Sequence, residues 1–465
     1  MKKHITRFIL PLLIFNISCK KILDTNPQNA ITVEEAQKAR DAVYAAVISA
    51  YDLLQSRDYY GRDFIASAET LADNCIIPSG ARGFFNAQSS NEPGSHTNIF
   101  FVAYGIIARA NFAIKYADGI AGTEAEKKVV KGEAYFLRAL VYFDLLNSYS
   151  RNPNYLINNF DWGVPLITDP ATEISQITYP AREKINAVYN LVIADLTNAG
   201  ALLNNSFKPN RASLGAVQAL LSRVYLYKGD WANADTWATT AINSNAAALA
   251  TATEYVSMWG KRAMKESFFE LNYEPAENLT TNSLQSIYSI DSVSGAGFGD
   301  LAASSSLLAS YFPNDIRTFP SLIRRTTRSG STVHYTRKFF GTKGSFGLDN
   351  IAILRISEIY LNRAEARARL GSDSLALVDL NKIHKRATGI DLIGLTGTNL
   401  INTILRERRV ELAFEGHRIF DLLRLGRDVT KPAGTVIPYT DFRLIARFPQ
   451  SEIDNNPNII QNPGY

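Results

Sequence analysis

Hydrophobic residues recur at steps of three and four along several long segments of the chain, which is the pattern of amphipathic helices. In the segment at about 33–56, the residues on one such face are Val43, Val47, Tyr51 and Leu54. Thr32 and Glu35 have the spacing of a capping box at its start. The pattern predicts a helical scaffold at about 32–56, 99–149, 181–243 and 351–426, with a last helix at about 399–426. We therefore expect a mostly α-helical fold.

Two parts of this scaffold share a residue spacing that is typical of tetratricopeptide helix pairs. Small side chains let two antiparallel helices pack closely, and a glycine ends the first helix of each pair. The residues with this spacing are Leu221, Ser222, Tyr225, Gly229, Trp231, Ala234, Ala238 and Ala241, and downstream Ala364, Gly371, Ala376 and Leu380. Two ordinary helical hairpins would also fit. Because the two units are not adjacent in the sequence, we do not expect a continuous solenoid.

Two regions, about 57–98 and about 250–349, lack helical periodicity and combine aromatic residues with Gly, Ser, Asn and Pro. We expect loop-rich excursions on the scaffold, where binding residues are often found. We also expect segments at about 78–92 and about 255–345 to come together over the scaffold and form the ligand site. An aromatic ring can stack on the apolar face of a sugar, while amide and guanidinium groups bond its hydroxyls. The candidate ligand-binding residues are Arg82, Phe84, Phe85, Asn86, Trp259, Tyr273, Tyr288, Phe298 and Tyr335. Alternatively, most of these rings cover the core beneath the loops.

The first residues of the chain have the layout of an export signal. Residues 1–18 hold three basic residues, then a short apolar stretch that ends in a small residue before Cys19. This layout predicts a lipoprotein signal peptide at 1–18, acylation of Cys19 and a lipidated tether at 19–31, followed by one helical domain at 32–465. A plain signal peptide with an unrelated Cys19 is the alternative. No later segment has 18 consecutive apolar residues, so we expect lipid to hold the mature chain.

Charge, composition and motifs argue against several classes of function. Without the three basic residues of segment 1–18 the net charge falls from +5 to +2, which is no basic footprint for nucleic acid. Two cysteines and five histidines leave little material for a disulfide framework or a zinc centre. The chain contains no H-E-x-x-H, C-x-x-C, P-loop or G-x-S-x-G motif. We therefore expect no catalytic residue, no metal and no cofactor.

Three carboxylates at Glu407, Glu411 and Glu415 follow each other at helical spacing. Two of them could serve as the acid and base of a glycosidase. The neighbouring arginines instead favour a network of ion pairs that ties the last helix to the rest of the protein.

Taken together, these residues resemble the SusD/RagB family of outer-membrane nutrient-binding lipoproteins. The segments that carry the resemblance are Cys19 with Ile22-Leu23-Asp24 and Pro27, Tyr104 with Ile107, Ala110 and Asn111, Glu133 to Ala139, Trp162 to Leu166, Arg355 to Glu365, Glu407-Arg408 with Glu411 to Arg418, Asp421-Leu422, Pro449 to Ile453, Asn456 to Asn458 and Gln461 to Tyr465.

The resemblance implies about four tetratricopeptide-like helix pairs, with a binding face on loops opposite the scaffold. It implies a non-enzymatic, lipid-anchored protein on the extracellular face of the outer membrane. Such a protein captures oligosaccharides, or in some members peptides, and delivers them to a SusC-like TonB-dependent transporter. It also implies a structural role for the Glu407–Glu415 cluster. A helical-barrel glycoside hydrolase and a structural adapter that binds no ligand are the alternative functions.

Overall fold

The computed structural model describes residues 32–465 except 205–208, 262–263, 291–296, 340 and 342–344. The predicted signal peptide, Cys19 and the tether lie outside the described residues. Within the described ranges, no helix is both long enough and apolar enough to cross a membrane.

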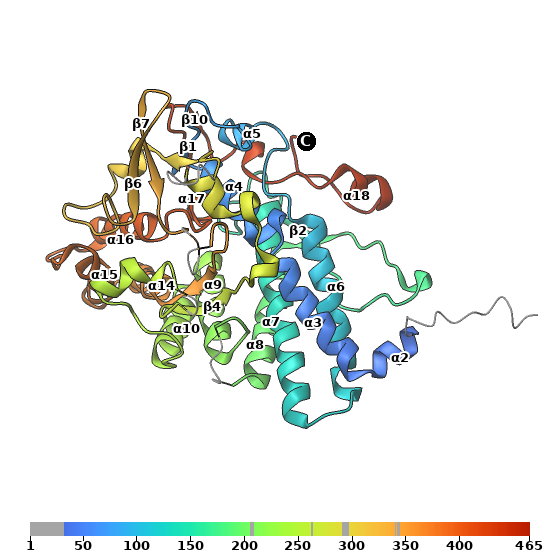
Figure 1. Cartoon of the computed structure of the whole chain (residues 1–465). Helices are drawn as coiled ribbons and strands as arrows, with labels where there is room; N and C mark the ends of the chain where they lie inside the picture. The colour runs from blue at the N-terminus through green and yellow to red at the C-terminus, as the bar shows by residue number, and fades with distance from the viewer. Residues whose placement is uncertain (1–31, 205–208, 262–263, 291–296, 340, 342–344) are drawn as a thin grey trace, which may run out of the picture.

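Helices dominate the fold, as the periodicity predicted (Figure 1). The longer ones are α3 (Arg40–Leu54), α6 (Phe100–Tyr116), α7 (Glu124–Tyr149), α8 (Ile185–Leu202), α9 (Leu214–Lys228), α10 (Trp231–Asn243), α14 (Ile356–Arg369), α15 (Asp373–Thr388) and α16 (Gly397–Glu411). The shorter ones are α2 (Val33–Lys38), α4 (Asp63–Thr70), α5 (Asn86–Ser89), α11 (Ala252–Met258), α12 (Leu284–Tyr288), α13 (Ser305–Leu308), α17 (Arg418–Arg424) and α18 (Gln450–Asn455).

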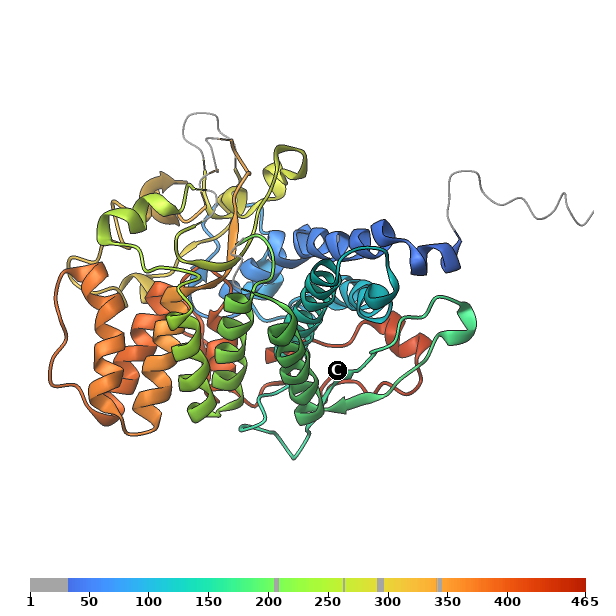
Figure 2. The same ribbon diagram turned by 90° about the horizontal axis from the view of Figure 1, so that it is seen from below.

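The long helices pack side by side in one row. The order of contact is α3, α6, α7, α8, α9, α10, α14 and then α15 with α16. Figure 2 shows this row from the blue and teal helices through the green ones to the orange ones. The expectation that the scaffold would not be continuous was wrong, because α10 packs directly on α14. The region at about 250–349 lies between α10 and α14 in the sequence but is not part of the row.

The helix pairs α9/α10 and α14/α15 confirm the repeat seen in the sequence. α9 ends at Gly229, whose φ of 80° is left-handed, and Asp230 then caps α10 by accepting a hydrogen bond from the backbone N–H of Asn233. Between α14 and α15, Gly371 has a φ of 78°. The small residues Ala234 and Ala376 are buried between the paired helices, as close packing requires.

Local signals also set the helix ends and the buried faces. The capping box at Thr32 is present at the start of α2, and a second one at Thr123 begins α7. On α3, the buried residues include the four predicted from the spacing, Val43, Val47, Tyr51 and Leu54. These side chains belong to the main hydrophobic core, which continues through α6, α7, α8 and α9.

The region at about 57–98 is not a continuous loop. It contains α4, in which every residue from Phe64 to Thr70 is buried. A helix that is covered on all sides needs no polar face, so its sequence lacks the amphipathic period. The loop prediction was therefore wrong for this segment, although most of residues 71–98 form irregular structure.

The helix predicted at about 399–426 is in fact two helices, α16 and α17. Between them, Phe414 and Gly416 have φ values of 71° and 83°. The buried carboxylate of Glu69 accepts hydrogen bonds from the backbone N–H groups of Gly416 and His417, at 2.9 and 3.2 Å. Helix α4 thus stabilises a break that the local periodicity of the later segment does not reveal.

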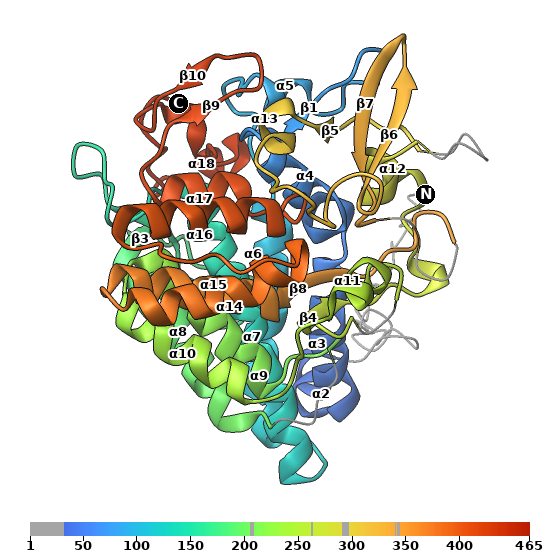
Figure 3. The same cartoon turned by 90° about the vertical axis from the view of Figure 1, so that its left-hand side faces the viewer.

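Short antiparallel strand pairs complete the fold. They are β1 (Cys75–Ile76) with β5 (Ala302–Ala303), β2 (Trp162–Pro165) with β3 (Arg182–Lys184), β4 (Ser267–Leu271) with β8 (Ile351–Arg355), β6 (Ile323–Arg328) with β7 (Ser331–Thr336), and β9 (Val429–Thr430) with β10 (Val436–Ile437). The β6–β7 hairpin lies far from α8 and α10 in Figure 3. The loop-rich region therefore reaches the side of the molecule away from these helices.

Candidate functional site

Two segments that are far apart in the sequence meet at the loop after β1. Asp300 is fully buried, and its carboxylate accepts hydrogen bonds from the backbone N–H of Arg82 at 2.7 Å and of Phe84 at 3.1 Å. One carboxylate therefore fixes the backbone on which Arg82 and Phe84 stand. The prediction that the two loop-rich regions come together over the scaffold is confirmed at this point.

Two neighbouring aromatic rings, each contacted by a guanidinium group, form the centre of this surface. The rings of Phe84 and Phe298 have centroids 5.5 Å apart, and the guanidinium carbon of Arg82 lies 3.8 Å from the centroid of Phe298. On the other side, the guanidinium carbon of Arg62 lies 5.7 Å from the Phe84 centroid. Phe84 is 48% exposed, and Arg82 and Asn86 are also exposed. We call Arg82, Phe84, Asn86 and Phe298 the Phe84 surface.

The β6–β7 hairpin supports this surface from below. Arg328 donates hydrogen bonds to the backbone carbonyls of Phe298 and Gly299, at 2.8 and 2.7 Å, and to that of Gly80. Gly299 has a φ of 52°, and a Cβ there would lie 2.6 Å from Ile290 Cγ1. A glycine is therefore required where the chain passes over the hairpin.

Five of the nine candidate residues are buried, so they are not ligand-binding surface in this conformation. They are Phe85, Trp259, Tyr273, Tyr288 and Tyr335, each at most 6% exposed. Tyr288 illustrates the reason, because its ring stacks on Phe339 and meets Phe414 edge-on. In this structure the five side chains pack in the core beneath the loops. The role of Arg82, Phe84, Asn86 and Phe298 in binding stays a prediction.

Three residues that position the surface were not among the candidates predicted from the sequence, namely Arg62, Asp300 and Arg328. Arg62 is held by Asp63, whose Oδ1 lies 2.6 Å from Arg62 Nε. None of the three belongs to a motif. The only signal for Asp300 was a weak one, the three alternating glycines Gly295, Gly297 and Gly299 directly before it.

The carboxylate cluster on the last helices forms a buried network of ion pairs. Glu411 is the centre, with Arg355 Nη1 at 2.5 Å from its Oε1. Arg386 Nη2 and Arg317 Nη1 lie 2.7 and 2.8 Å from its Oε2. The Tyr255 hydroxyl also donates to Glu411 at 3.1 Å. Four elements far apart in the sequence are joined at this one carboxylate.

The two flanking carboxylates are held in the same way. Glu415 lies 2.7 Å from Arg355 Nε and 2.6 Å from Lys338 Nζ. Glu407 lies 2.6 Å from an Arg317 nitrogen. The side chains of Glu407 and Glu415 are at most 5% exposed.

The electrostatics of this cluster do not suit a glycosidase. Burial by itself raises the pKa of Glu411, but Arg386, Arg355 and Arg317 lower that pKa well below its usual value. A glycosidase needs a carboxyl that stays protonated beside the glycosidic bond. The interpretation of the three glutamates as a structural ion-pair network is confirmed.

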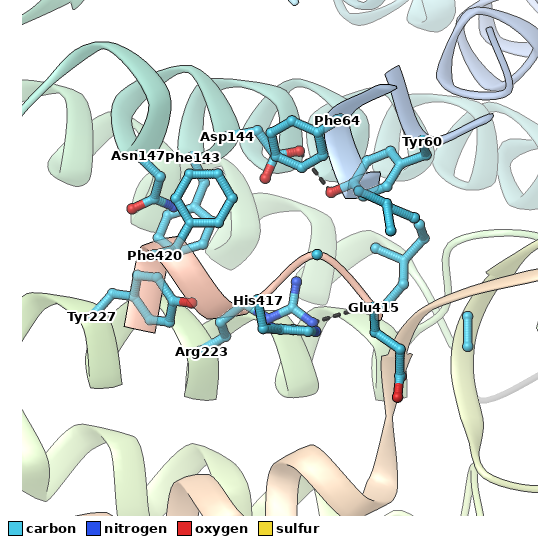
Figure 4. A pocket seen from close by; sticks show the side chains of 14 residues that line it. Tyr60, Phe64, Phe143, Asp144, Asn147, Arg223, Tyr227, Glu415, His417 and Phe420 are labelled. Carbon is cyan, nitrogen blue, oxygen red and sulfur yellow. Dashed lines mark hydrogen bonds between the residues drawn. The ribbon is translucent and has the colours of Figure 1, made fainter. Parts of the chain in front are cut away.

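A small cavity lies between α7, α9 and the segment before α17 (Figure 4). Its volume of about 30 Å³ has room for one or two water molecules. Asp144 points into it and accepts hydrogen bonds from the hydroxyls of Tyr59 and Tyr60 at 2.5 and 2.7 Å. Burial raises the pKa of Asp144 to about 6 and lowers the pKa of His417 to about 4. The cavity is too small for a sugar.

Metal binding has no visible basis in the described parts of the chain, where no three His, Cys, Asp or Glu side chains are grouped so that they could hold an ion.

Comparison with known proteins decides the family. A model described as "SusD family" matches residues 314–435, and one described as "Starch-binding associating with outer membrane" matches residues 21–226. The chain belongs to the SusD/RagB family. The match at 314–435 contains Glu411 and the arginines that pair with it, and the match at 21–226 contains Arg82 and Phe84.

Individual SusD-like proteins are similar to all or part of this chain. The SusD-like protein P2 of Formosa agariphila is 26% identical over 100% of both chains. The starch-binding protein SusD of Bacteroides thetaiotaomicron is 33% identical over 25% of this chain and 22% of its own. A crystal structure of a putative sugar-binding protein from Bacteroides vulgatus has a TM-score of 0.81 and 28% identity, covering 92% of this chain and 99% of that one. The family resemblance stated from the sequence is thus confirmed.

Proposed function

We propose that this protein captures oligosaccharides at the outer membrane and delivers them to a SusC-like TonB-dependent transporter. The family description names starch binding and outer-membrane association, and one relative is named a starch-binding protein. A solved relative is described as a putative sugar-binding protein. These names support a carbohydrate ligand but not its identity. A peptide ligand remains the second possibility that the family resemblance implies.

The observation that carries the proposal is the exposed Phe84 ring beside Phe298 and Arg82. The exposed Phe84 ring and the accessible part of Phe298 offer apolar surface to sugar rings, with about 1–2 kcal/mol for each ring that a ligand covers. The exposed guanidinium of Arg82 and the amide of Asn86 supply directed hydrogen bonds to hydroxyl groups. Asp300 and Arg328 already hold the backbone beneath these side chains through hydrogen bonds. Ligand binding would therefore cost little conformational entropy in the loop.

Alanine substitution of both rings tests the proposal. An affinity-gel or glycan-array screen of the purified protein first identifies a ligand, and calorimetry then gives its Kd. The Phe84→Ala/Phe298→Ala variant should bind at least tenfold more weakly, which is about 1.4 kcal/mol. Phe101→Ala is the matched control, since Phe101 is 55% exposed on α6, outside this surface. Unchanged binding by the double variant, with its fold intact, would place the ligand site elsewhere.

The transporter and the anchor need separate tests. The lipid on Cys19 and the extracellular face are proposals from the export layout and the family. Purification of the protein from solubilised outer membranes should recover a TonB-dependent barrel. Protease added to intact cells should digest the protein if it lies on the outer face.

The two alternative functions predict different results. A glycoside hydrolase would release reducing ends from the ligand, whereas the buried Glu411 network offers no open carboxylate pair for this reaction. A structural adapter would bind no glycan at all, and the transporter would still copurify.

A further inference from the structure

A groove of about 300 Å³ lies along α16 and α17. It shares no residue with the Phe84 surface, and Figure 3 places α16 and α17 away from the β6–β7 hairpin that supports that surface. Five of its lining residues are arginines: Arg406, Arg408, Arg409, Arg418 and Arg427. Ser310, Asn402, Leu405 and Leu425 supply neutral polar and apolar lining.

Few carboxylates lie at this groove, and each of them already pairs with arginines. Asp421 is the one carboxylate in the lining, and it pairs with Arg408 at 2.8 Å and with Arg424 at 2.8 Å. Beside the groove, Asp73 pairs with Arg418 at 2.6 Å and with Arg409 at 3.3 Å. Each of these carboxylates therefore serves two guanidinium groups.

Two of the arginines have no carboxylate partner in the described parts of the chain. Arg406 donates to the backbone carbonyls of Ser310 and Tyr311, at 2.7 and 3.0 Å. Arg427 makes a single long hydrogen bond, 3.4 Å, to the amide oxygen of Asn402. Both side chains are exposed, and each guanidinium carries five N–H donors. Most donors of Arg427 are thus available to a ligand.

The arginines of the groove also repel one another. Burial and the charge of Arg418 lower the pKa of Arg409 to about 10. Burial, Arg418 and Arg369 lower the pKa of Arg427. An anion in the groove would relieve this repulsion.

We propose that this groove binds a sulfate or phosphate group carried by a sugar. Guanidinium groups recognise such oxyanions through paired hydrogen bonds. The exposed amide of Asn402 suits sugar hydroxyls, and Leu405 and Leu425 suit the face of a ring. The volume of about 300 Å³ lies at the small end of ligand pockets, which fits one or two sugar units. The site does not depend on ligand binding at the Phe84 surface.

Calorimetry on the purified protein at constant ionic strength tests this site. Glucose 6-sulfate and glucose 6-phosphate are the probes, glucose is the neutral control, and inorganic phosphate is the anion without a sugar. We expect saturable binding of at least one ester, weaker binding of inorganic phosphate and none of glucose. Arg406→Gln/Arg427→Gln should raise the Kd of the ester at least tenfold.

A matched variant controls for net charge. Lys128→Gln/Lys382→Gln removes the same charge from exposed positions outside the groove and should leave the Kd unchanged. The melting temperature reports folding, and Arg427→Gln alone replaces the double variant if that one unfolds. Equal weakening by the lysine variant would overturn the proposal, as would unchanged binding by the arginine variants or equal affinity for inorganic phosphate and both esters. Arginine-dependent binding to phosphatidylglycerol vesicles without ester binding would instead assign the groove to a lipid headgroup, which also overturns it.

Discussion

The guanidinium group of Arg82 lies over the ring of Phe298, with 3.8 Å between its central carbon and the ring centroid. The two residues come from different loop-rich regions, and the buried carboxylate of Asp300 links those regions through the backbone of Arg82. Guanidinium and ring together form a rigid, partly apolar face that still carries hydrogen-bond donors. This pair is the centre of the proposed sugar-binding surface.

Asp300→Asn should loosen the loop that carries Phe84. An asparagine amide has one acceptor oxygen where the carboxylate uses both for the N–H groups of Arg82 and Phe84. We expect faster hydrogen exchange at those two amides and a loss of about 1–3 kcal/mol in the free energy of unfolding. Asp391→Asn, at an exposed position, is the control. Unaltered exchange at both amides would contradict the role of Asp300.

Glu411→Gln should cost stability rather than a chemical step. The substitution removes the negative charge on which Arg355, Arg386 and Arg317 converge. Breaking a buried ion pair from one side costs about 3–5 kcal/mol. Urea denaturation of the variant and of Glu34→Gln, an exposed control, measures the difference. Loss of ligand binding with an unchanged melting temperature would contradict a structural role for Glu411.

Asp144→Asn should change how stability depends on pH. The pKa of Asp144 is about 6 in the folded protein against 3.8 for an ordinary aspartate, so the folded state holds the proton more tightly. The wild type therefore loses stability as the pH rises from about 4 to above 6, in total about 3 kcal/mol from this group. The variant lacks this loss, so its free energy of unfolding relative to wild type should rise across that window. A constant difference from pH 4 to 7 would contradict the raised pKa.

His417→Gln should change the pH dependence of stability in the direction opposite to Asp144→Asn. The pKa of His417 is about 4 in the folded protein against 6.5 for an ordinary histidine, so the unfolded state binds the proton more tightly. The wild type gains stability from this group as the pH rises from about 4 to above 6.5. The variant lacks this gain, so its stability relative to wild type should fall with rising pH. Chemical denaturation at several pH values measures both variants.

Cys19→Ala should prevent stable membrane attachment. The expected product is a soluble or uncleaved protein, because the acylated thiol is the predicted anchor. Membrane fractionation and the size of the product on a gel are the measurements. Normal processing together with unchanged membrane association would rule out lipidation at this residue.

Much of the scaffold could be predicted because its signals are local. The face formed by Val43, Val47 and Leu54, the capping box at Thr32 and the glycine that ends α9 all act within one or two helical turns. The signal for the last helix was also local, but it predicted one helix where the structure has two, α16 and α17. A backbone left-handed at Phe414 and stabilised by Glu69 depends on a helix far away in the sequence.

The candidate site was predictable only in outline. The sequence indicated that the two loop-rich regions would meet, and Phe84 and Phe298 do lie together. Whether an aromatic residue of a loop is exposed depends on what packs over it, so Tyr288 and Tyr335 were as plausible as Phe84 until their burial was known. The support from Asp300 and Arg328 has no sequence motif, since a single carboxylate or guanidinium can face any backbone.

The amino-acid sequence by itself determined the helical class, the helix-pair repeat and the membership in the SusD/RagB family, because periodicity, capping and family segments are read along the chain. Only the tertiary structure decided that the helices form one continuous row, which rings remain exposed, and that five arginines line one groove. These features depend on contacts between residues distant in the sequence. Such contacts are selected by packing and by the pairing of buried charge, and no local pattern encodes them.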